Sequence, residues 1–396
     1  RMADNNCEGG AHVSELNGRE AAREIVEIDA TPVAVGIAVH NGPISGIAVS
    51  RDGSRLMVSN YGDNSVSAID TDTFRVLETV DGVEEPFAIA IGGSGTGQGY
   101  VSTVSAAYDS IQVIDTSANA VVATYPLALS VSDLAVDSAG RHVYASRNAD
   151  GVADLAVLDT ETGRIQTIDV AAATRTPGTT TECVRLSPDG TRAYVGINGP
   201  SGGRLVVIGT KAQSGAAGGR VRCRHKRPTG QQTGLRVIDT VEIGLPVRDV
   251  ALSPGGAIAY VSSYAPEVGV VVDVVDTRTN KITNTHKVGD TGAILTGMTL
   301  SADGDRAYLV SDENVTVLCT RTYDVLATLG AGTQPSCVVE SPDGKRLYIA
   351  DYSGAVTVTP LASTSPLAIE ATALDSELST AGWLLPDLVP HEPVLA

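Results

Sequence analysis

Three consecutive segments of the chain carry ionisable residues at two neighbouring positions of a repeat. Asp133 lies in the first segment, Glu182 in the second, and the pair Arg248 and Asp249 in the third, each a few residues ahead of a tight glycine turn. Converging carboxylates can hold a hard cation such as Ca²⁺ or Mg²⁺ through oxygen ligands, or supply a general base. The Arg248 guanidinium can bind a carboxylate or phosphate through two parallel hydrogen bonds.

These positions belong to a unit that recurs along the chain. Each unit has an apolar run, a tight turn and a second run that reads like Y-V-S-N, and the turn glycines are Gly53, Gly97, Gly140, Gly190, Gly256, Gly304 and Gly344. Four short β runs with a period of roughly 40 to 50 residues are the signature of a propeller blade. The sequence therefore predicts an all-β fold, a seven-bladed β-propeller of four-stranded blades.

The best-formed unit predicts four strands, at Ile44–Val49, Arg55–Asn60, Ser65–Asp70 and Phe74–Val80. The last unit supplies only three strands before its pattern ends near Leu361. A strand at the other end of the propeller segment, Val33–Val39, has the character of the missing fourth. We therefore expect this N-terminal strand to pair with the last blade and close the ring, which also hides aggregation-prone edges.

The repeat sets the domain boundaries. The propeller is predicted over residues 23–361, with a flexible N-terminal segment at 1–22 and a C-terminal tail at 362–396. A Gly- and Ser-rich insertion at 211–234 interrupts the fourth blade. It contains five cationic residues, Arg220, Arg222, Arg224, Lys226 and Arg227. We expect it on the face of the ring that carries the D-G turns.

Composition limits the possible partners. The chain has 396 residues, of which 42% are hydrophobic, and its net charge is −18. An acidic protein lacks the basic footprint that nucleic acids and anionic membranes require. No apolar run reaches the about 18 residues of a membrane span. We therefore expect a monomer that binds a protein partner or small ligand, with no transmembrane segment and no general affinity for nucleic acid.

The cysteines and the N-terminus bear on location. Five cysteines lie far apart, with no C-x-x-C pair, which indicates free thiols in a reducing compartment. No apolar signal-peptide region is visible at the start of the sequence. These features predict a cytoplasmic protein, and an exported or envelope-associated protein is the alternative.

The repeats resemble a known family. Tyr194-Val195-Gly196, Tyr260-Val261-Ser262 and Tyr348-Ile349-Ala350 follow turns of the S-P-D-G type. They resemble the bacterial YVTN-type seven-bladed propellers, over about residues 33–361, and look most like an actinobacterial member. That broad class includes surface-layer and periplasmic propellers and propellers similar to 6-phosphogluconolactonase. No haem-attachment motif and no catalytic residue of the lactonase-like group matches this chain, so the resemblance implies no cofactor and no catalytic role.

Alignment of the first strands predicts a channel mouth. The residue four before each turn serine or its equivalent is Gly46, Ala88, Asp133, Cys183, Asp249, Gly297 or Cys337, and the position before it includes Glu182 and Arg248. A divalent cation would have Asp133, Glu182 and Asp249 as its candidate ligands. The alternative is a structural, water-filled mouth in which Arg248 neutralises its neighbours. No histidine aligns with Cys183 or Cys337 to activate a thiol.

A second set of candidates follows the second strand of each blade. Its members are Tyr61, Arg147, Asn148, Asn198, Tyr264, Asp312 and Tyr352. Aromatic and amide side chains on the loops of a rigid scaffold can bind a glycan or peptide. The alternative is that these residues cap their own blades.

Three functional hypotheses follow. The first is a non-catalytic propeller that binds a partner protein or small ligand at the channel mouth, because no nucleophile, base and oxyanion donor come together. The second is a metal-assisted, lactonase-like hydrolase that uses Asp133, Glu182 and Asp249. The third is binding of nucleic acid or an acidic partner through residues 220–227.

Overall fold

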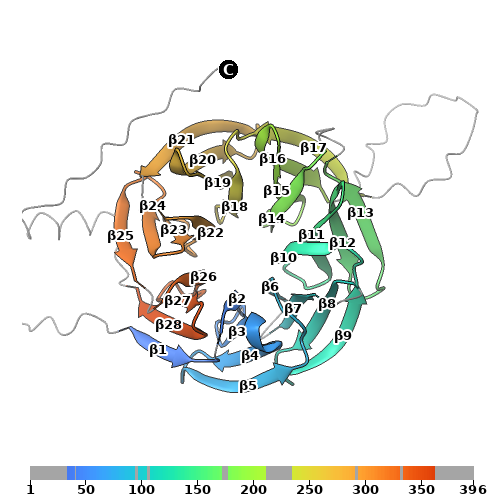
Figure 1. Cartoon of the computed structure of the whole chain (residues 1–396), viewed down its shortest axis with the longest axis vertical. Coiled ribbons are helices and arrows are strands. Elements are labelled where there is room, and N and C mark those ends of the chain that lie inside the picture. The colour runs from blue at the N-terminus through green and yellow to red at the C-terminus, as the bar shows by residue number, and fades with distance from the viewer. Residues whose placement is uncertain are drawn as a thin grey trace, which may run out of the picture. The chain divides into compact units, whose positions relative to one another are not determined.

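The computed structural model describes residues 34–40, 42–93, 97–104, 108–171, 177–210, 234–289, 293–330 and 333–361. The basic insertion except for Gly234, the N-terminal segment and the C-terminal tail lie outside these residues. Seven four-stranded antiparallel sheets form a ring (Figure 1). The predicted all-β, seven-bladed propeller is therefore confirmed.

The first three blades follow one another along the chain. Blade 1 comprises β2 (Ile44–Val49), β3 (Arg55–Asn60), β4 (Ser65–Asp70) and β5 (Arg75–Asp81). Blade 2 comprises β6 (Ile89–Gly92), β7 (Gln98–Thr103), β8 (Ser110–Asp115) and β9 (Ala120–Pro126). Blade 3 comprises β10 (Ser130–Val136), β11 (His142–Ala149), β12 (Val152–Asp159) and β13 (Ile165–Asp169).

The next three blades repeat this order. Blade 4 comprises β14 (Thr180–Leu186), β15 (Arg192–Gly199), β16 (Gly202–Gly209) and β17 (Arg236–Glu242). Blade 5 comprises β18 (Val247–Leu252), β19 (Ile258–Ala265), β20 (Gly269–Asp276) and β21 (Lys281–Gly289). Blade 6 comprises β22 (Leu295–Leu300), β23 (Arg306–Ser311), β24 (Val315–Cys319) and β25 (Val325–Leu329).

Blade 7 closes the ring. It comprises β26 (Pro335–Glu340), β27 (Arg346–Asp351), β28 (Ala355–Pro360) and, as its outer strand, β1 (Val35–Ala38). β1 pairs antiparallel with β28, with Val35 opposite Val358 and Ala38 opposite Ala355. The closure predicted from the sequence is confirmed, and Figure 1 shows β1 beside β28 at the edge of blade 1.

Side-chain hydrogen bonds fix the turn between the first two strands. In blade 1 the Ser50 hydroxyl donates to Asp52 Oδ1 at 2.6 Å, and Gly53 takes a φ of +76°, which favours glycine. The bond from Ser50 holds the pKa of the Asp52 carboxyl below its ordinary value. The same serine-to-aspartate bond recurs in three later blades, at Ser187–Asp189, Ser301–Asp303 and Ser341–Asp343.

A threonine after the third strand joins the two turns of the blade in blades 1 to 6. The Thr277 hydroxyl donates to the Gly256 carbonyl at 2.6 Å. Equivalent bonds join Thr71 to Gly53, Thr116 to Gly97, Thr160 to Gly140, Thr210 to Gly190 and Thr320 to Gly304. These threonines, four of which follow an aspartate in the sequence, thus connect both hairpins at one end of the ring, the face called the bottom here.

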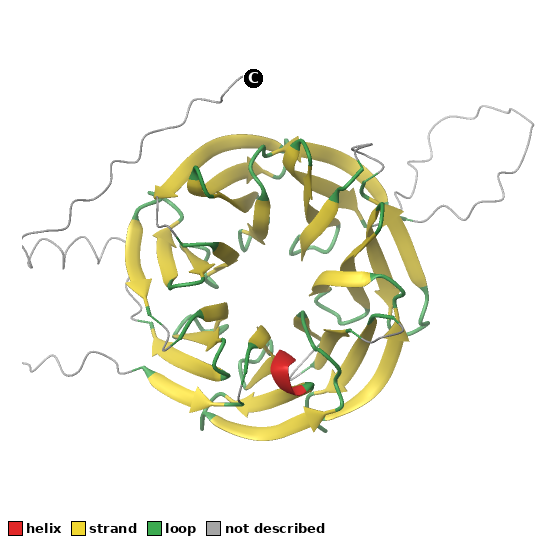
Figure 2. Cartoon of the chain, viewed as in Figure 1, coloured by secondary structure: helices red, strands yellow, loops and turns green. Residues whose placement is uncertain are grey.

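The core lies between neighbouring blades. The tyrosines that follow the turns are buried, and Tyr100, Tyr194, Tyr308 and Tyr348 are among the largest fully buried side chains. The Tyr308 hydroxyl donates to Glu340 Oε2 in the next blade, while burial raises the pKa of this tyrosine. Strands make up nearly all of the regular structure (Figure 2). No helix among the described residues is long and apolar enough to cross a bilayer.

Ring closure predicts a sharp glycine effect. Gly354 has a φ of +93°, and a Cβ there would lie 2.0 Å from the His40 carbonyl oxygen on the closing segment. We expect Gly354→Ala to lower the free energy of unfolding by more than the roughly 1 to 3 kcal/mol of an unfavourable φ alone. Gly151→Ala is the matched control, because Gly151 has a φ of +70° with open space around its Cβ position. Equal losses in urea unfolding of the two variants would contradict this steric role for Gly354.

Candidate functional site

The first strands of all seven blades surround one cavity. Its volume is 840 Å³, and it is lined by residues of β2, β6, β10, β14, β18, β22 and β26 or of the segments that adjoin them. Figure 1 shows these strands around the centre of the ring. The cavity follows the central channel and contains the ionisable residues that the sequence placed at its mouth.

A register shift sets the direction of the side chains at the mouth. In six blades the ladder between the first and second strands shifts by one residue, and the skipped residues are Ser45, Ser132, Glu182, Arg248, Thr296 and Ser336. A bulge leaves a residue outside the ladder and re-aims its side chain. Glu182 and Arg248 both line the cavity from such positions.

Arg185 holds two of the predicted carboxylates together. Its Nη1 donates to Asp133 Oδ2, and its Nη2 donates to Asp249 Oδ1 at 2.7 Å. The three residues come from β10, β14 and β18, so this pair of charge-assisted bonds links three adjacent blades. The counter-ion of these carboxylates is therefore Arg185 and not Arg248.

Backbone amides complete the environment of both carboxylates. Asp133 accepts from the amides of Leu134 at 2.8 Å and of Val184 at 3.0 Å. Asp249 accepts from the amides of Val250 at 2.7 Å and of Met298 at 2.9 Å. Val184 and Met298 belong to the next blade in each case, so each aspartate also bridges a blade junction.

The pKa shifts follow from burial and charge. Burial raises the pKa of the Asp249 carboxyl, and the Arg185 guanidinium opposes this. Burial disfavours the charged form of Arg185, but the carboxylates of Asp133 and Asp249 outweigh it and raise the guanidinium pKa. Removal of any one of the three charges would leave another without the partner that offsets its desolvation cost.

The candidate metal ligands are not arranged as a metal site. Within the described part of the chain, no three His, Cys, Asp or Glu side chains gather closely enough to hold a metal ion. Asp133 and Asp249 already accept three hydrogen bonds each, and Glu182 accepts one from the Thr180 hydroxyl at 3.2 Å. A cation at Asp133 Oδ2 or Asp249 Oδ1 would compete with the Arg185 guanidinium.

Arg248 differs from Arg185 in having no partner. It forms no hydrogen bond or ion pair with any residue that the structure describes, and its buried Nε has no acceptor. Glu182 at the equivalent bulge of the neighbouring blade is also without a cationic partner among those residues. These two side chains are the charges of the cavity that the fold leaves uncompensated.

The two channel cysteines are protonated thiols. Burial, followed by the Asp249 carboxylate, raises the pKa of the Cys183 thiol well above its ordinary value. Burial raises the pKa of Cys337 to about 12. Because the thiolate is the nucleophile, neither cysteine is activated at neutral pH.

Sequence reasoning missed Arg185, although a signal was present. Side chains alternate along a strand, so the residue two positions after Cys183 lies on the same face. The equivalent residues in the other blades are Ala48, Ala90, Ala135, Ala251, Thr299 and Val339. A single arginine at a position that otherwise holds small or medium side chains indicates that the neighbouring blades leave room for it and supply its counter-charge.

Several predicted rim residues form part of the fold. Arg147 is buried and pairs with Asp154 through bonds of 2.7 and 2.8 Å. Asn148 bonds the amide and carbonyl of Thr181 in the next blade at 2.7 and 3.0 Å. Asn198 binds Val247 in the same way, at 2.8 and 2.9 Å. These two amides therefore act as inter-blade clamps.

The remaining rim residues are divided between core and surface. Tyr264 is buried in a cluster between blades 5 and 6. Asp312 accepts from the Ile294 amide at 2.7 Å. Tyr61 lies in the 3₁₀ turn η1 (Tyr61–Asp63), and both Tyr61 and Tyr352 are exposed. These two tyrosines are the predicted rim aromatics that remain available to a ligand.

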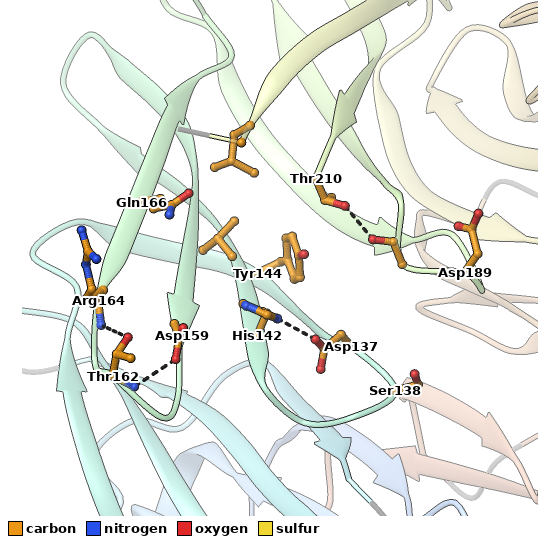
Figure 3. Close-up of a pocket in the computed structure, with 14 residues that line it drawn as sticks. Asp137, Ser138, His142, Tyr144, Asp159, Thr162, Arg164, Gln166, Asp189 and Thr210 are labelled. Atoms are coloured by element: carbon orange, nitrogen blue, oxygen red, sulfur yellow. Dashed lines mark hydrogen bonds and ion pairs between the residues drawn. The ribbon is translucent and has the colours of Figure 1, made fainter. Parts of the chain in front are cut away.

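A second pocket of 460 Å³ lies at the turn end of blades 3 and 4 (Figure 3). Asp137 and His142, joined at 2.8 Å, form part of its wall, together with Asp159. Thr210, which precedes the basic insertion, and Gly234, its last residue, also line it. The insertion thus starts and ends on the face that carries the D-G turns, as predicted. Its residues 211–233 lie outside the described chain, so their binding role stays a prediction.

Comparison with known proteins identifies the family. The seven-bladed beta-propeller protein Rv1057 of Mycobacterium tuberculosis is 54% identical over 397 residues, which cover 97% of this chain and 100% of that protein. The chain belongs to this family of seven-bladed propellers. Kuenenia stuttgartiensis hydrazine synthase matches with a TM-score of 0.66 at 20% identity, over 83% of this chain and 98% of that one. This second likeness shows the fold alone.

The source of the family relative agrees with the actinobacterial resemblance. No protein-family model matches the chain. Membership of the YVTN-repeat group therefore stays a prediction, while membership of the seven-bladed family is established by the relative.

The Arg185 cluster predicts a pH-dependent loss of stability. Arg185→Met should lower the free energy of unfolding by roughly 3 to 5 kcal/mol at neutral pH, because two desolvated carboxylates lose their counter-ion. Without Arg185 the pKa of Asp249 rises further above its unfolded value, so folding is stabilised as the pH falls into the carboxylate range. The deficit relative to wild type should therefore shrink between about pH 7.5 and about pH 5 in urea unfolding.

A rescue variant tests the same interaction. Asp133→Asn and Asp249→Asn, added to Arg185→Met, remove both charges and keep an acceptor for one of the two backbone amides at each site. This triple variant should be more stable than Arg185→Met at neutral pH. A deficit that is independent of pH and is not rescued would contradict the electrostatic account.

Proposed function

We propose that this protein is a non-catalytic binding propeller that takes a small acidic ligand in the mouth of its channel, anchored by Arg248. The observation that carries the proposal is the uncompensated Arg248 guanidinium, half-buried on a rigid strand beside an open cavity. A guanidinium presents a planar set of donors that matches a carboxylate or phosphate. No described residue supplies an acceptor for it, so an external anion would provide the missing hydrogen bonds.

The contrast with Arg185 supports this assignment. Both arginines line the same cavity, and the fold supplies two carboxylates to one and none to the other. The counter-charge of Arg185 is therefore part of the protein, whereas we propose that the counter-charge of Arg248 comes from a ligand. The thiols of Cys183 and Cys337 are protonated at neutral pH, and the described lining includes no histidine. These features favour binding over acyl transfer by a thiol nucleophile.

Calorimetric titration with a panel of organic acids and inorganic phosphate tests the proposal. At least one member should bind wild type, and Arg248→Gln should weaken it by about 10- to 100-fold, the range for a lost charge-assisted hydrogen bond. Arg278→Gln is the control, because Arg278 is an exposed arginine whose removal makes the same change in net charge. Binding that survives in Arg248→Gln would overturn the proposal. Binding of an acidic protein but of no small acid would point to a protein partner.

Metal addition distinguishes this proposal from the hydrolase alternative. Ca²⁺, Mg²⁺ and Mn²⁺ should leave the melting temperature unchanged, because the oxygens of Asp133 and Asp249 already accept from Arg185 and backbone amides. Asp133→Asn/Asp249→Asn is the matched variant. A bound divalent ion in wild type that is lost in this variant would favour the hydrolase.

A further inference from the structure

The cavity carries two uncompensated charges of opposite sign. Glu182 on β14 and Arg248 on β18 occupy equivalent bulge positions of adjacent strands. They form no ion pair with each other. The three remaining charges, on Asp133, Arg185 and Asp249, are joined to one another. A ligand that met Arg248 alone would leave the Glu182 carboxylate beside it without a counter-charge.

Apolar side chains are exposed on the other blades around this mouth. Phe87 on blade 2 is 45% exposed and Ile294 on blade 6 is 47% exposed, and both line the cavity. Neighbouring positions hold small side chains, at Gly46, Ala88 and Gly297. The charged residues Glu182 and Arg248 therefore lie on blades 4 and 5, and of the two apolar side chains only Ile294 stands on an adjoining blade, whereas Phe87 stands on blade 2, which adjoins neither.

From this arrangement, and resting on the proposed acid-binding function, we infer that the ligand is a small zwitterion with an apolar group. An apolar α-amino acid is the simplest molecule of this class. Its carboxylate would pair with Arg248, its ammonium with Glu182, and its side chain would lie against Ile294 on the blade next to Arg248. A ligand without net charge also avoids repulsion by a protein of net charge −18, which an anion would meet.

Four probes separate the contributions of the ligand. L-phenylalanine has all three groups, 3-phenylpropionate lacks the ammonium, phenethylamine lacks the carboxylate, and glycine lacks the apolar group. In calorimetric titration, L-phenylalanine should bind at least about tenfold more tightly than each of the other three. Glycine should bind more weakly because it lacks the apolar group and not a charge, since each buried methylene contributes about fourfold in affinity.

Three single variants assign the groups of the protein. Glu182→Gln, which keeps the shape of the side chain, should reduce L-phenylalanine to the affinity of 3-phenylpropionate and leave 3-phenylpropionate unweakened. Arg248→Gln should weaken both of these probes. Ile294→Ala should weaken both while leaving the affinity for glycine unchanged. Melting curves of each variant confirm that it is folded, and Arg278→Gln again controls for charge.

The outcomes distinguish this inference from the proposed function. If 3-phenylpropionate binds as tightly as L-phenylalanine and responds to Arg248→Gln, the zwitterion is overturned and the acid-binding function stands. If only acids without an apolar group bind, the apolar part of the inference is overturned as well. If Arg248→Gln changes no affinity, both proposals fail. If Glu182→Gln removes the preference for the ammonium group, the inference is supported.

Discussion

Antiparallel pairing of β1 with β28 is the interaction on which the ring depends. Each blade presents two apolar faces, and these faces are buried only if every blade has a neighbour on both sides. The cluster that contains Ile37, Ile44, Tyr348 and Val356 spans the junction of blades 7 and 1. Closure therefore buries a core that an open array would leave exposed, and it pairs the edge of β28.

A closed ring makes the channel a rigid site. Side-chain bonds across the blade junctions, such as those of Asn148, Asn198, Asp133 and Asp249, hold the first strands in register with one another. Arg248 and Glu182 extend from these fixed strands, so their backbone positions are set before any ligand arrives. Pre-organisation of this kind reduces the ordering cost of binding.

The sequence predicted the fold in detail because each blade is specified by short turn and strand motifs within its own segment. Two of these motifs recur from blade to blade, the turn at Ser50–Gly53 and the strand Arg55–Asn60. The closing strand was predicted because it completes a blade that otherwise has three strands. The chemistry of the channel was harder to predict. Asp133 and Asp249 were identified as channel residues, but their partner Arg185 was not, because pairing across three blades depends on distances that no local pattern encodes.

The same limit applies to the rim. Asn198 and Tyr61 look alike as polar loop residues, yet Asn198 bonds the next blade while Tyr61 is exposed. A rim side chain is buried or hydrogen-bonded only where the neighbouring blade presents a partner at the same level along the channel axis. In a repeat protein the neighbour is distant in sequence, so burial of rim residues follows from the three-dimensional arrangement alone.

The uneven placement of charge around the channel has a consequence for orientation. Seven identical blades would present a guest with seven equivalent poses related by rotation about the axis. Here Glu182 and Arg248 mark two adjacent blades, while Phe87 and Ile294 mark others. Sequence divergence among the repeats has made the seven orientations about the axis inequivalent. A guest with distinguishable ends therefore has one favoured orientation in the channel.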